Sequence, residues 1–553
     1  MVRGSSRAEA PETPADSLVR RLLGALDAIA ARSWAAIAIP ALLALAVCLA
    51  GAASSGIPKP TIHDEFSYLL AADTFARGRL TNPTHTMWMH FETMHVVHRP
   101  TYQSMYPPGQ GLLLAIGQRL GHPVIGVWIG VAAMTAAFVW MLQAWLPPRW
   151  ALIGGVLTAA KLVMVGQAAS YLTVGYWSRT YWGGALAAFG GALLYGALRR
   201  IVEQPRVRDA LIMTAGLGVL AVTRPLEGFM ASLPAAAVLL VWLVRKRGIE
   251  LRRAARRVVV PVVLGLMTLS AGVLYYNHRV TGDALKMPWM LHHEQYGVFP
   301  VLLFQSAEPP PAYRHDALRK FHTGWELSYF ERSRTKGDLV RLMEQKAGRL
   351  WRFYFGPVFV LPLLVLPWVL RDPWMRLAAA GCLAVGVTNF LTVFLFPHYS
   401  APAACLVFVL MTEGLRRLSQ LRVRDRPLGA TAAAGVVLAA VFTMLLSIPD
   451  SARAPTALAR LFDRAHLIED LEHRGGKHLI IVRYEEPHAV HEEWVFNGAD
   501  LDHASVLFAR DMGEDGNREL LEYYSDRTAW LLVVSDTIAR PAPVLYETAT
   551  PPA

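Results

Sequence analysis

Two adjacent carboxylates, Asp64 and Glu65, follow the first long apolar run of the chain, in the stretch TIHDEFSY (61–68). At a membrane edge such a pair can hydrogen-bond an acceptor hydroxyl or hold a divalent cation. A carboxylate in a partly dry site gains proton affinity, which suits a general base. Alternatively, the two acids only begin an amphipathic helix over 64–77, where they favour the helix dipole. The spacing leaves both interpretations open.

A proline turn follows in the same polar segment, in the stretch YQSMYPPG (102–109), which begins at Tyr102 and carries Tyr106 beside the two prolines. Paired prolines fix an extended approach and then allow a helix to start, because proline is tolerated in the first turn. Alone, this pattern indicates a turn. Its place, about forty residues after the two carboxylates and just before the next apolar run, is more specific.

The composition limits the elements that can position these residues. The chain has 553 residues, of which 54% are hydrophobic and only 17% are charged. Soluble domains carry about 25% charged residues, so a soluble enzyme and a disordered chain are both disfavoured. The three cysteines (Cys48, Cys382 and Cys405) lie inside apolar stretches. They therefore form neither a disulfide framework nor a cysteine metal site.

Apolar runs of about 17–25 residues predict membrane spans, and the chain contains about eleven of them. They lie near 34–53, 123–145, 150–169, 181–198, 210–223, 229–244, 258–276, 351–370, 375–396, 400–415 and 429–448. We therefore expect a mainly α, polytopic membrane protein with about 11 transmembrane helices.

The basic residues indicate the orientation of these spans. Arginine-rich loops near 199–208, 245–257, 371–376 and 416–426 all fall on one side if the N-terminus is cytoplasmic, as the positive-inside rule requires. The net charge of +12 (54 Lys and Arg against 42 Asp and Glu) is then a topology signal, and no nucleic-acid partner is needed to explain it. The C-terminus is predicted to lie on the extracytoplasmic side.

Three units follow from this topology. Residues 1–33 form a cytoplasmic tail with an interfacial helix, and 34–448 form the transmembrane domain with outer loops at 55–110 and 277–350. Residues 449–553 form a small extracytoplasmic α/β domain. This domain is predicted from helical stretches at 456–473 and 517–526 and β-like runs at 478–484 and 529–535. Its polar cluster, His488, His491, Glu492 and Glu493, is interpreted as a surface loop.

This combination resembles the GT-C superfamily of membrane glycosyltransferases, especially the branch of protein O-mannosyltransferases and lipid A aminoarabinose transferases. The resemblance rests on His63-Asp64-Glu65, the Tyr106–Gly109 turn, an Arg224-Pro225 turn and the order of spans over roughly 30–450. In that family the first outer loop carries a catalytic acidic residue, and the donor is a polyprenyl-phosphate sugar. The resemblance implies that Asp64 is the catalytic base, with Glu65 assisting or substituting.

Displacing a polyprenyl phosphate requires positive charge where the charge of the leaving group develops. Arg224 lies within about a turn of two apolar runs, and its forked guanidinium suits phosphate oxygens. An ion pair with Glu227 explains it equally well, and the two roles can coexist. Arg179, in YWSRTYW (176–182), is a second candidate, although an interfacial aromatic belt also accounts for that stretch. The complete set of candidate substrate-binding residues is His63, Tyr68, Arg99, Tyr102, Tyr106, Arg179, Arg224, Glu227, His398 and Tyr399.

The predicted activity is transfer of the sugar to an acceptor hydroxyl (on a glycan, lipid or protein) in one inverting step on the extracytoplasmic face. The composition, rich in Ala and Arg, favours a bacterial inner membrane, with membrane lipids around the spans. No cofactor is required, and a divalent metal stays open: His95-Val-Val-His98 has ligand types, although packing explains it as well.

Two alternatives are a flippase or transporter for a lipid-linked sugar and a non-catalytic scaffold. Transporters place charges midway through broken helices and have repeated halves. Here the charges lie at the outer edge and no repeat is evident, which favours the enzyme.

Overall fold

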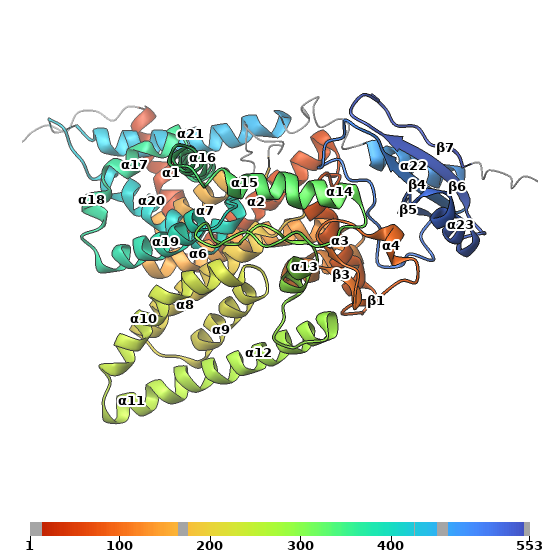
Figure 1. Ribbon diagram of the computed structural model, residues 1–553. Coiled ribbons are helices and arrows are strands. Elements are labelled where there is room, and N and C mark those ends of the chain that lie inside the picture. The colour runs from red at the N-terminus through yellow and green to blue at the C-terminus, as the bar shows by residue number, and fades with distance from the viewer. Residues whose placement is uncertain (1–13, 164–174, 425, 451–462, 547–553) are drawn as a thin grey trace, which may run out of the picture.

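The computed structural model describes residues 14–163, 175–424, 426–450 and 463–546. The first half is an array of helices, which pack around one large apolar core (Figure 1). Its helices are α1 (Pro14–Ala30), α2 (Ser33–Ser55), α3 (His63–Ala76), α4 (Trp88–Phe91), α5 (Pro108–Arg119), α6 (Pro123–Trp145), α7 (Pro148–Leu162), α8 (Gly184–Glu203), α9 (Val207–Ala221), α10 (Pro225–Val244), α11 (Gly248–Ala254) and α12 (Val260–Thr281).

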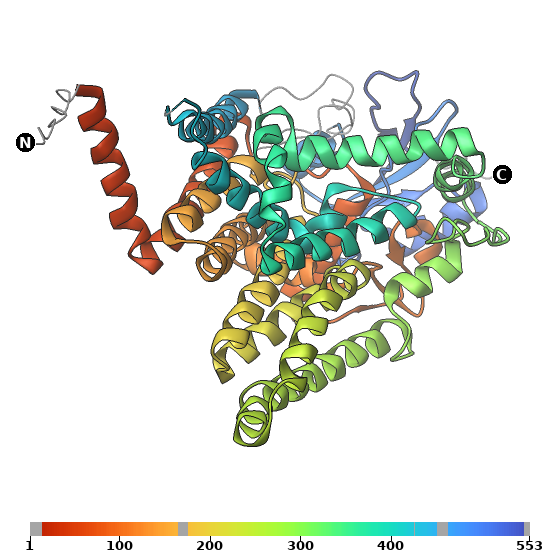
Figure 2. The ribbon, with the colours of Figure 1, turned by 90° about the vertical axis from the view of Figure 1, so that its left-hand side faces the viewer.

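The π-helical turn η1 (Ala255–Val259) joins α11 to α12. In both views α9 to α12 extend away from the other helices (Figures 1 and 2). The second half contains α13 (Pro288–Tyr296), α14 (Asp316–Arg319), η2 (Lys320–Glu326), α15 (Leu327–Glu331), α16 (Lys336–Leu350), η3 (Trp351–Phe355), η4 (Pro357–Phe359), α17 (Val360–Leu364), α18 (Leu366–Val369), α19 (Pro373–Leu391), η5 (Pro397–Ala403), α20 (Ala404–Ser419), α21 (Leu428–Asp450), α22 (Asp463–Arg474) and α23 (Gly513–Tyr523).

Within the described residues, seven of the eleven predicted spans are helices long and apolar enough to cross a membrane. They are Ser33–Ser55, Pro123–Trp145, Gly184–Glu203, Pro225–Val244, Gly248–Thr281, Pro373–Leu391 and Leu428–Ile448. Three further runs form the shorter helices α7, α9 and α20, and the end of the run 150–169 lies outside the described residues. These helices are those of a multi-pass membrane protein, with seven full-length candidate spans among the described residues.

The predicted span at 351–370 is wrong as a single helix. The structure divides it into η3, η4, α17 and α18. Gly356 takes a positive φ of 63°, and Pro357, Pro362 and Pro367 follow it. Proline lacks the N–H that the helix ladder needs and clashes with the preceding turn, so an apolar run with this spacing cannot remain one helix.

The first outer loop is folded as predicted around a short helix and a proline turn. The expected helix at 64–77 is α3, and the helix expected after the paired prolines is α5, which starts at Pro108. Between them, β1 (Asn82–Pro83), β2 (Val96–Val97) and β3 (Thr101–Ser104) form a small antiparallel sheet in the order β1-β3-β2. The loop is therefore a structured layer and not a flexible connection.

The C-terminal segment contains the predicted strands. β4 (His478–Tyr484) pairs in parallel with β5 (Val506–Arg510) and β6 (Thr528–Val534), and β7 (Val544–Leu545) adds an antiparallel edge. α23 connects β5 to β6. The first part of the expected helix 456–473 lies outside the described residues, and its end is α22.

This sheet packs against the first outer loop (Figure 1). One apolar cluster combines Leu70 and Phe91 of the loop with Leu479, Phe496 and further side chains of the tail. The contact also contains a buried ion pair, because Nη2 of Arg510 lies 2.7 Å from Glu493 and its Nε donates to the carbonyl oxygen of Glu92. The expectation of a surface loop is therefore wrong at Glu493, whose charge is buried with a partner.

Removing the cation of this pair leaves a buried carboxylate without compensation. We expect Arg510→Met to lower the free energy of unfolding by about 3–5 kcal/mol. Arg518 forms an exposed pair with Asp515 (side chains 65% and 95% exposed), so Arg518→Met should change it by less than about 0.5 kcal/mol. Thermal unfolding of the detergent-purified protein measures the stability of both variants. Equal losses of stability in Arg510→Met and Arg518→Met would contradict the role of the buried pair.

Candidate active site

A cavity of about 560 Å³ lies where the first outer loop meets the helices. Its walls come from the start of α3, the proline turn, the junction of α9 and α10, one end of α12 and residues 392–399. Most of the lining is apolar or aromatic, including Phe229, Val273, Trp289, Phe299, Val301, Phe394 and Phe396. Water is therefore scarce around the few charged groups that face the cavity.

Asp64 faces this cavity from the first turn of α3. The hydroxyl of Tyr106 donates to its Oδ1, and Nδ1 of His63 lies 3.3 Å from its Oδ2. Burial favours the protonated acid, but the neighbouring histidines and these polar contacts outweigh it and hold the pKa of Asp64 well below its usual range. The side chain is therefore an ionised carboxylate in an apolar site, and the gain in proton affinity expected from the dry surroundings does not occur.

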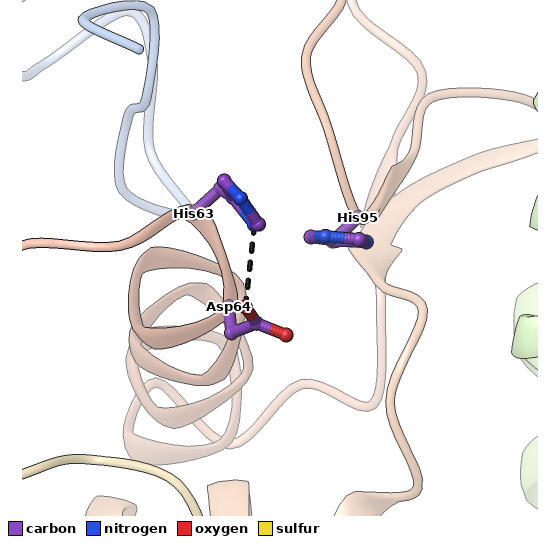
Figure 3. A group of neighbouring side chains, drawn as sticks. All are labelled: His63, Asp64 and His95. Carbon is purple, nitrogen blue, oxygen red and sulfur yellow. Dashed lines mark ion pairs between the residues drawn. The ribbon is translucent and has the colours of Figure 1, made fainter. Parts of the chain in front are cut away.

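His63 and His95 lie beside Asp64 (Figure 3), and His491 from a third segment contacts His63. The rings of His63 and His95 are 4.6 Å apart, and Nε2 of His63 lies 3.1 Å from Nδ1 of His491. His491 belongs to the C-terminal tail, so its place here contradicts the expected surface loop. Only the unusual density of polar residues around it in the sequence could have indicated this. His95 also has a positive φ of 61°, a conformation that non-glycine residues adopt at some cost.

His98 does not join His95 beside Asp64, so packing, the second explanation of this pair, holds for His98. Nε2 of His98 instead accepts a hydrogen bond from the main-chain N–H of Thr93, and its ring packs on Tyr102. His63, Asp64 and His95 each offer one ligand atom within 4.8 Å of the others. The Nδ1 atom of His95 is buried without a hydrogen-bond partner in the described part of the chain, while Nδ1 of His63 lies 3.3 Å from Asp64. This donor set suits a divalent metal ion.

Glu65 points away from the cavity. Its Oε2 accepts hydrogen bonds from the main-chain N–H of Thr61 (2.9 Å) and Ile62 (3.4 Å), and its Oε1 accepts one from Tyr181 (3.0 Å). Burial raises the pKa of Glu65 to about 7, against the effect of these N–H donors. The geometry gives Glu65 a structural role, because it holds the start of α3 against the segment at 181.

Arg224 faces the cavity at the start of α10 and is the single Lys or Arg among the described residues that lines it. Its guanidinium lies over the ring of Tyr399, 4.4 Å from the ring centre. Glu227 lines the same cavity, but the structure shows no ion pair between the two side chains in its described ranges. The guanidinium is thus held by an aromatic ring, and the charge of Glu227 acts on it without a direct ion pair. Tyr68 and Tyr106 stack beside it at 4.4 Å between ring centres.

Besides Glu65, four predicted substrate-binding residues do not line the cavity. Arg179 donates to the carbonyl oxygens of Gly51 and Gly56, so it caps the end of α2. The other three are also used elsewhere: His398 pairs with the hydroxyl of Tyr176, Tyr102 donates to the carbonyl oxygen of Asn497, and Arg99 stacks on Trp88. Their residue types suit phosphate or sugar, but their side chains contact other parts of the protein outside the cavity.

A second cavity of about 390 Å³ adjoins the first and shares Ala221, Val222 and Val273 with it. It is lined by α9 and α12, and Ser270 is the single polar residue in its lining among the residues that the structure describes. The second cavity therefore lies beside the first along α9 and α12, and α12 also exposes apolar side chains such as Leu264 and Met267.

No protein-family model and no curated protein matches this sequence. Solved structures do match the fold. The oligosaccharyltransferase of Archaeoglobus fulgidus, tethered with an acceptor peptide containing the NVT sequon, matches with a TM-score of 0.51 and 11% identity, over 90% of this chain and 68% of that chain. ArnT from Cupriavidus metallidurans in the apo state matches with a TM-score of 0.51 and 11% identity, over 90% of this chain and 93% of its own.

The chain therefore shares its fold with these two solved structures. The fold implied by the resemblance to the GT-C superfamily, which was inferred from the Asp-Glu stretch, the proline turn and the order of spans, is thereby confirmed. The narrower branch within the superfamily stays a prediction.

The contrasting positions of Asp64 and Glu65 give a direct test. Glu65→Ala leaves three main-chain N–H groups without their acceptor, so we expect it to lower the free energy of unfolding by about 2–4 kcal/mol. Asp64→Asn can still accept the hydrogen bond from Tyr106 and should change it by less than about 1 kcal/mol. Thermal unfolding compares the two. A larger loss in Asp64→Asn would mean that the roles are reversed.

Proposed function

We propose that the protein transfers a sugar from a polyprenyl-phosphate donor to an acceptor hydroxyl on the extracytoplasmic face of a bacterial inner membrane. The N-terminus would be cytoplasmic and the C-terminus extracytoplasmic. The observation that carries the proposal is that Asp64 and Arg224 face one apolar cavity in a GT-C fold. One supplies a base, and the other supplies charge for a phosphate. The acceptor is a glycan, lipid or protein hydroxyl.

The reaction is a single displacement. Asp64 takes the proton of the acceptor hydroxyl as its oxygen attacks the anomeric carbon of the sugar. The bond from that carbon to the phosphate oxygen breaks, and the polyprenyl phosphate leaves with the electron pair. Attack from the side opposite the leaving group inverts the anomeric carbon.

Arg224 stabilises the phosphate as its negative charge grows. A guanidinium in a site with little water acts strongly on a developing charge and offers two parallel donors to phosphate oxygens. The ring of Tyr399 packs against one face of the guanidinium. The N–H groups at the edge of the guanidinium can therefore point toward the phosphate.

The second cavity supports a lipid-linked donor. Its apolar walls on α9 and α12 continue from the charged groups toward the exposed apolar face of α12. A polyprenyl chain lying there would keep its hydrocarbon out of water while its phosphate reaches Arg224. A soluble nucleotide-sugar has no part that requires such a path.

His63, Asp64 and His95 would hold a divalent metal ion if one is bound. Such an ion would supply further positive charge near the transferred group. The roles of Asp64 as base and Arg224 as phosphate partner do not depend on it.

Transfer from a panel of radiolabelled polyprenyl-phosphate sugars by the purified protein tests the proposal. We expect Asp64→Asn to lower the rate by about 10²–10⁴-fold, because the amide cannot take the proton. Arg224→Gln should lower it by about 10²–10³-fold, because the leaving charge loses its partner.

Matched controls separate these effects from loss of folding. Asp526 is exposed and pairs with Lys477 on the distant sheet, so Asp526→Asn should leave transfer unchanged. Arg99 also stacks on an aromatic ring but lies outside the cavity, which makes Arg99→Gln the control for Arg224→Gln. Full activity of Asp64→Asn would refute the mechanism. Movement of the lipid between leaflets without any turnover would favour a flippase.

The path for the lipid chain gives a further prediction. Ser270→Trp places a large ring in the second cavity, so we expect KM for a long-chain donor to rise roughly tenfold while KM for a short-chain analogue changes little. Thr268→Trp adds the same ring on α12 outside that cavity and serves as the control. Equal effects on both donors would argue against a lipid path along α9 and α12.

A further inference from the structure

Three side chains that can bind metals meet at one edge of the C-terminal sheet. His488 and Glu492 belong to the loop after β4, and Asp536 lies two residues beyond β6. β4 and β6 are parallel neighbours, so their carboxyl ends share an edge of the sheet. One ligand atom of each side chain lies within 4.8 Å of the other two.

The spacing fits a bound ion after small side-chain movements. Ligand atoms at about 2.0–2.2 Å from a metal lie roughly 3–4 Å from one another. Nδ1 of His488 is buried and has no hydrogen-bond partner among the residues that the structure describes, while its ring stacks on Tyr484 with 4.5 Å between ring centres. The stacking holds the plane of the imidazole without using its nitrogen.

The main chain already holds these segments together. The N–H of Asp536 donates to the carbonyl oxygen of Pro487 (2.7 Å), and the N–H of Ala489 donates to Oδ1 of Asp536 (3.0 Å). The loop after β4 and the end of β6 therefore keep a fixed spacing, so the three ligands need little ordering when an ion binds.

We propose that His488, Glu492 and Asp536 form a binding site for a divalent transition-metal ion, Zn²⁺ or Mn²⁺. One imidazole nitrogen and two carboxylate oxygens suit these ions. Ca²⁺ and Mg²⁺ prefer oxygen ligands alone and match the set less well. Three protein ligands leave coordination positions for water, so the ion acts as a clamp between the loop and β6.

The clamp has a consequence for the candidate active site, and this consequence rests on the proposed function. His491 lies between two of the ligands in the sequence, and its Nδ1 is 3.1 Å from Nε2 of His63. Its ring also packs edge-on against Trp325, with 4.6 Å between ring centres. Holding the loop therefore holds His491, a positioning residue, against the histidine that contacts Asp64.

Metal binding is measured on the full-length, detergent-purified protein. The protein is stripped with EDTA and equilibrated by dialysis with Zn²⁺ or Mn²⁺ in separate arms, with Ca²⁺ and Mg²⁺ for comparison, and bound metal is counted by mass spectrometry. We expect Asp536→Asn and Glu492→Gln each to lose one bound equivalent, with affinity at least about tenfold weaker. Glu486→Gln, on the same loop but paired with Lys320, should keep it.

Each outcome decides between alternatives. Asp536→Asn and Glu492→Gln must also lose the bound equivalent in a His95→Ala background. His95→Ala removes a ligand of the separate group beside Asp64, so that group cannot account for the loss. Unchanged binding in Asp536→Asn and Glu492→Gln, or no binding in the wild type, would overturn the site. Equal binding of Ca²⁺ and Mg²⁺, lost in the same variants, would overturn the assignment to a transition metal.

The coupling to the candidate active site has its own readout. We expect Asp536→Asn to lower the transfer rate about threefold to tenfold in the wild type but to have no added effect in His491→Ala, because both changes act through one contact. Additive effects would show that the clamp does not act through His491. Metal counting does not need transfer, so a failed transfer assay and a failed metal site are distinguishable.

Discussion

The hydrogen bonds from three main-chain N–H groups to the Glu65 carboxylate are the constraint on which the rest of the site depends. Neighbouring residues on a helix point about 100° apart. Once Glu65 is fixed toward Thr61, Ile62 and Tyr181, Asp64 must face the other way, into the cavity. The two adjacent carboxylates thus have separate tasks: one anchors the start of the helix, and the other stays available for chemistry.

The site also depends on the contact between the first outer loop and the C-terminal tail. They share one apolar cluster, and the buried pair of Arg510 and Glu493 joins them through the carbonyl oxygen of Glu92. Desolvating two charges is costly unless their hydrogen bonds are satisfied, so this pair favours a single relative placement of the two segments. That placement brings His491 to His63. A residue more than 400 positions away in sequence thereby completes the surroundings of Asp64.

The sequence predicts local features well, because their causes are local. Proline spacing places the start of α5, short apolar runs place β4 and β6, and apolar length finds seven of the spans. Spacing and residue type cannot tell which way a side chain faces. Arg179 and Arg224 both lie next to predicted spans in the sequence, yet one caps α2 and the other lines the cavity. His95 and His98 have ligand spacing, but the strand β2 between them carries them to different neighbours.

The apolar walls of the cavity explain why so few charged groups are needed. In a site with little water, a carboxylate and a guanidinium act strongly on a ligand, but each is costly to keep there. Tyr106 and His63 stabilise Asp64 as a carboxylate, while the ring of Tyr399 supports Arg224 without cancelling its charge. The same walls continue into the path between α9 and α12. An apolar surface that strengthens the electrostatics at one end therefore also provides, at the other end, a place for the hydrocarbon of a lipid-linked donor.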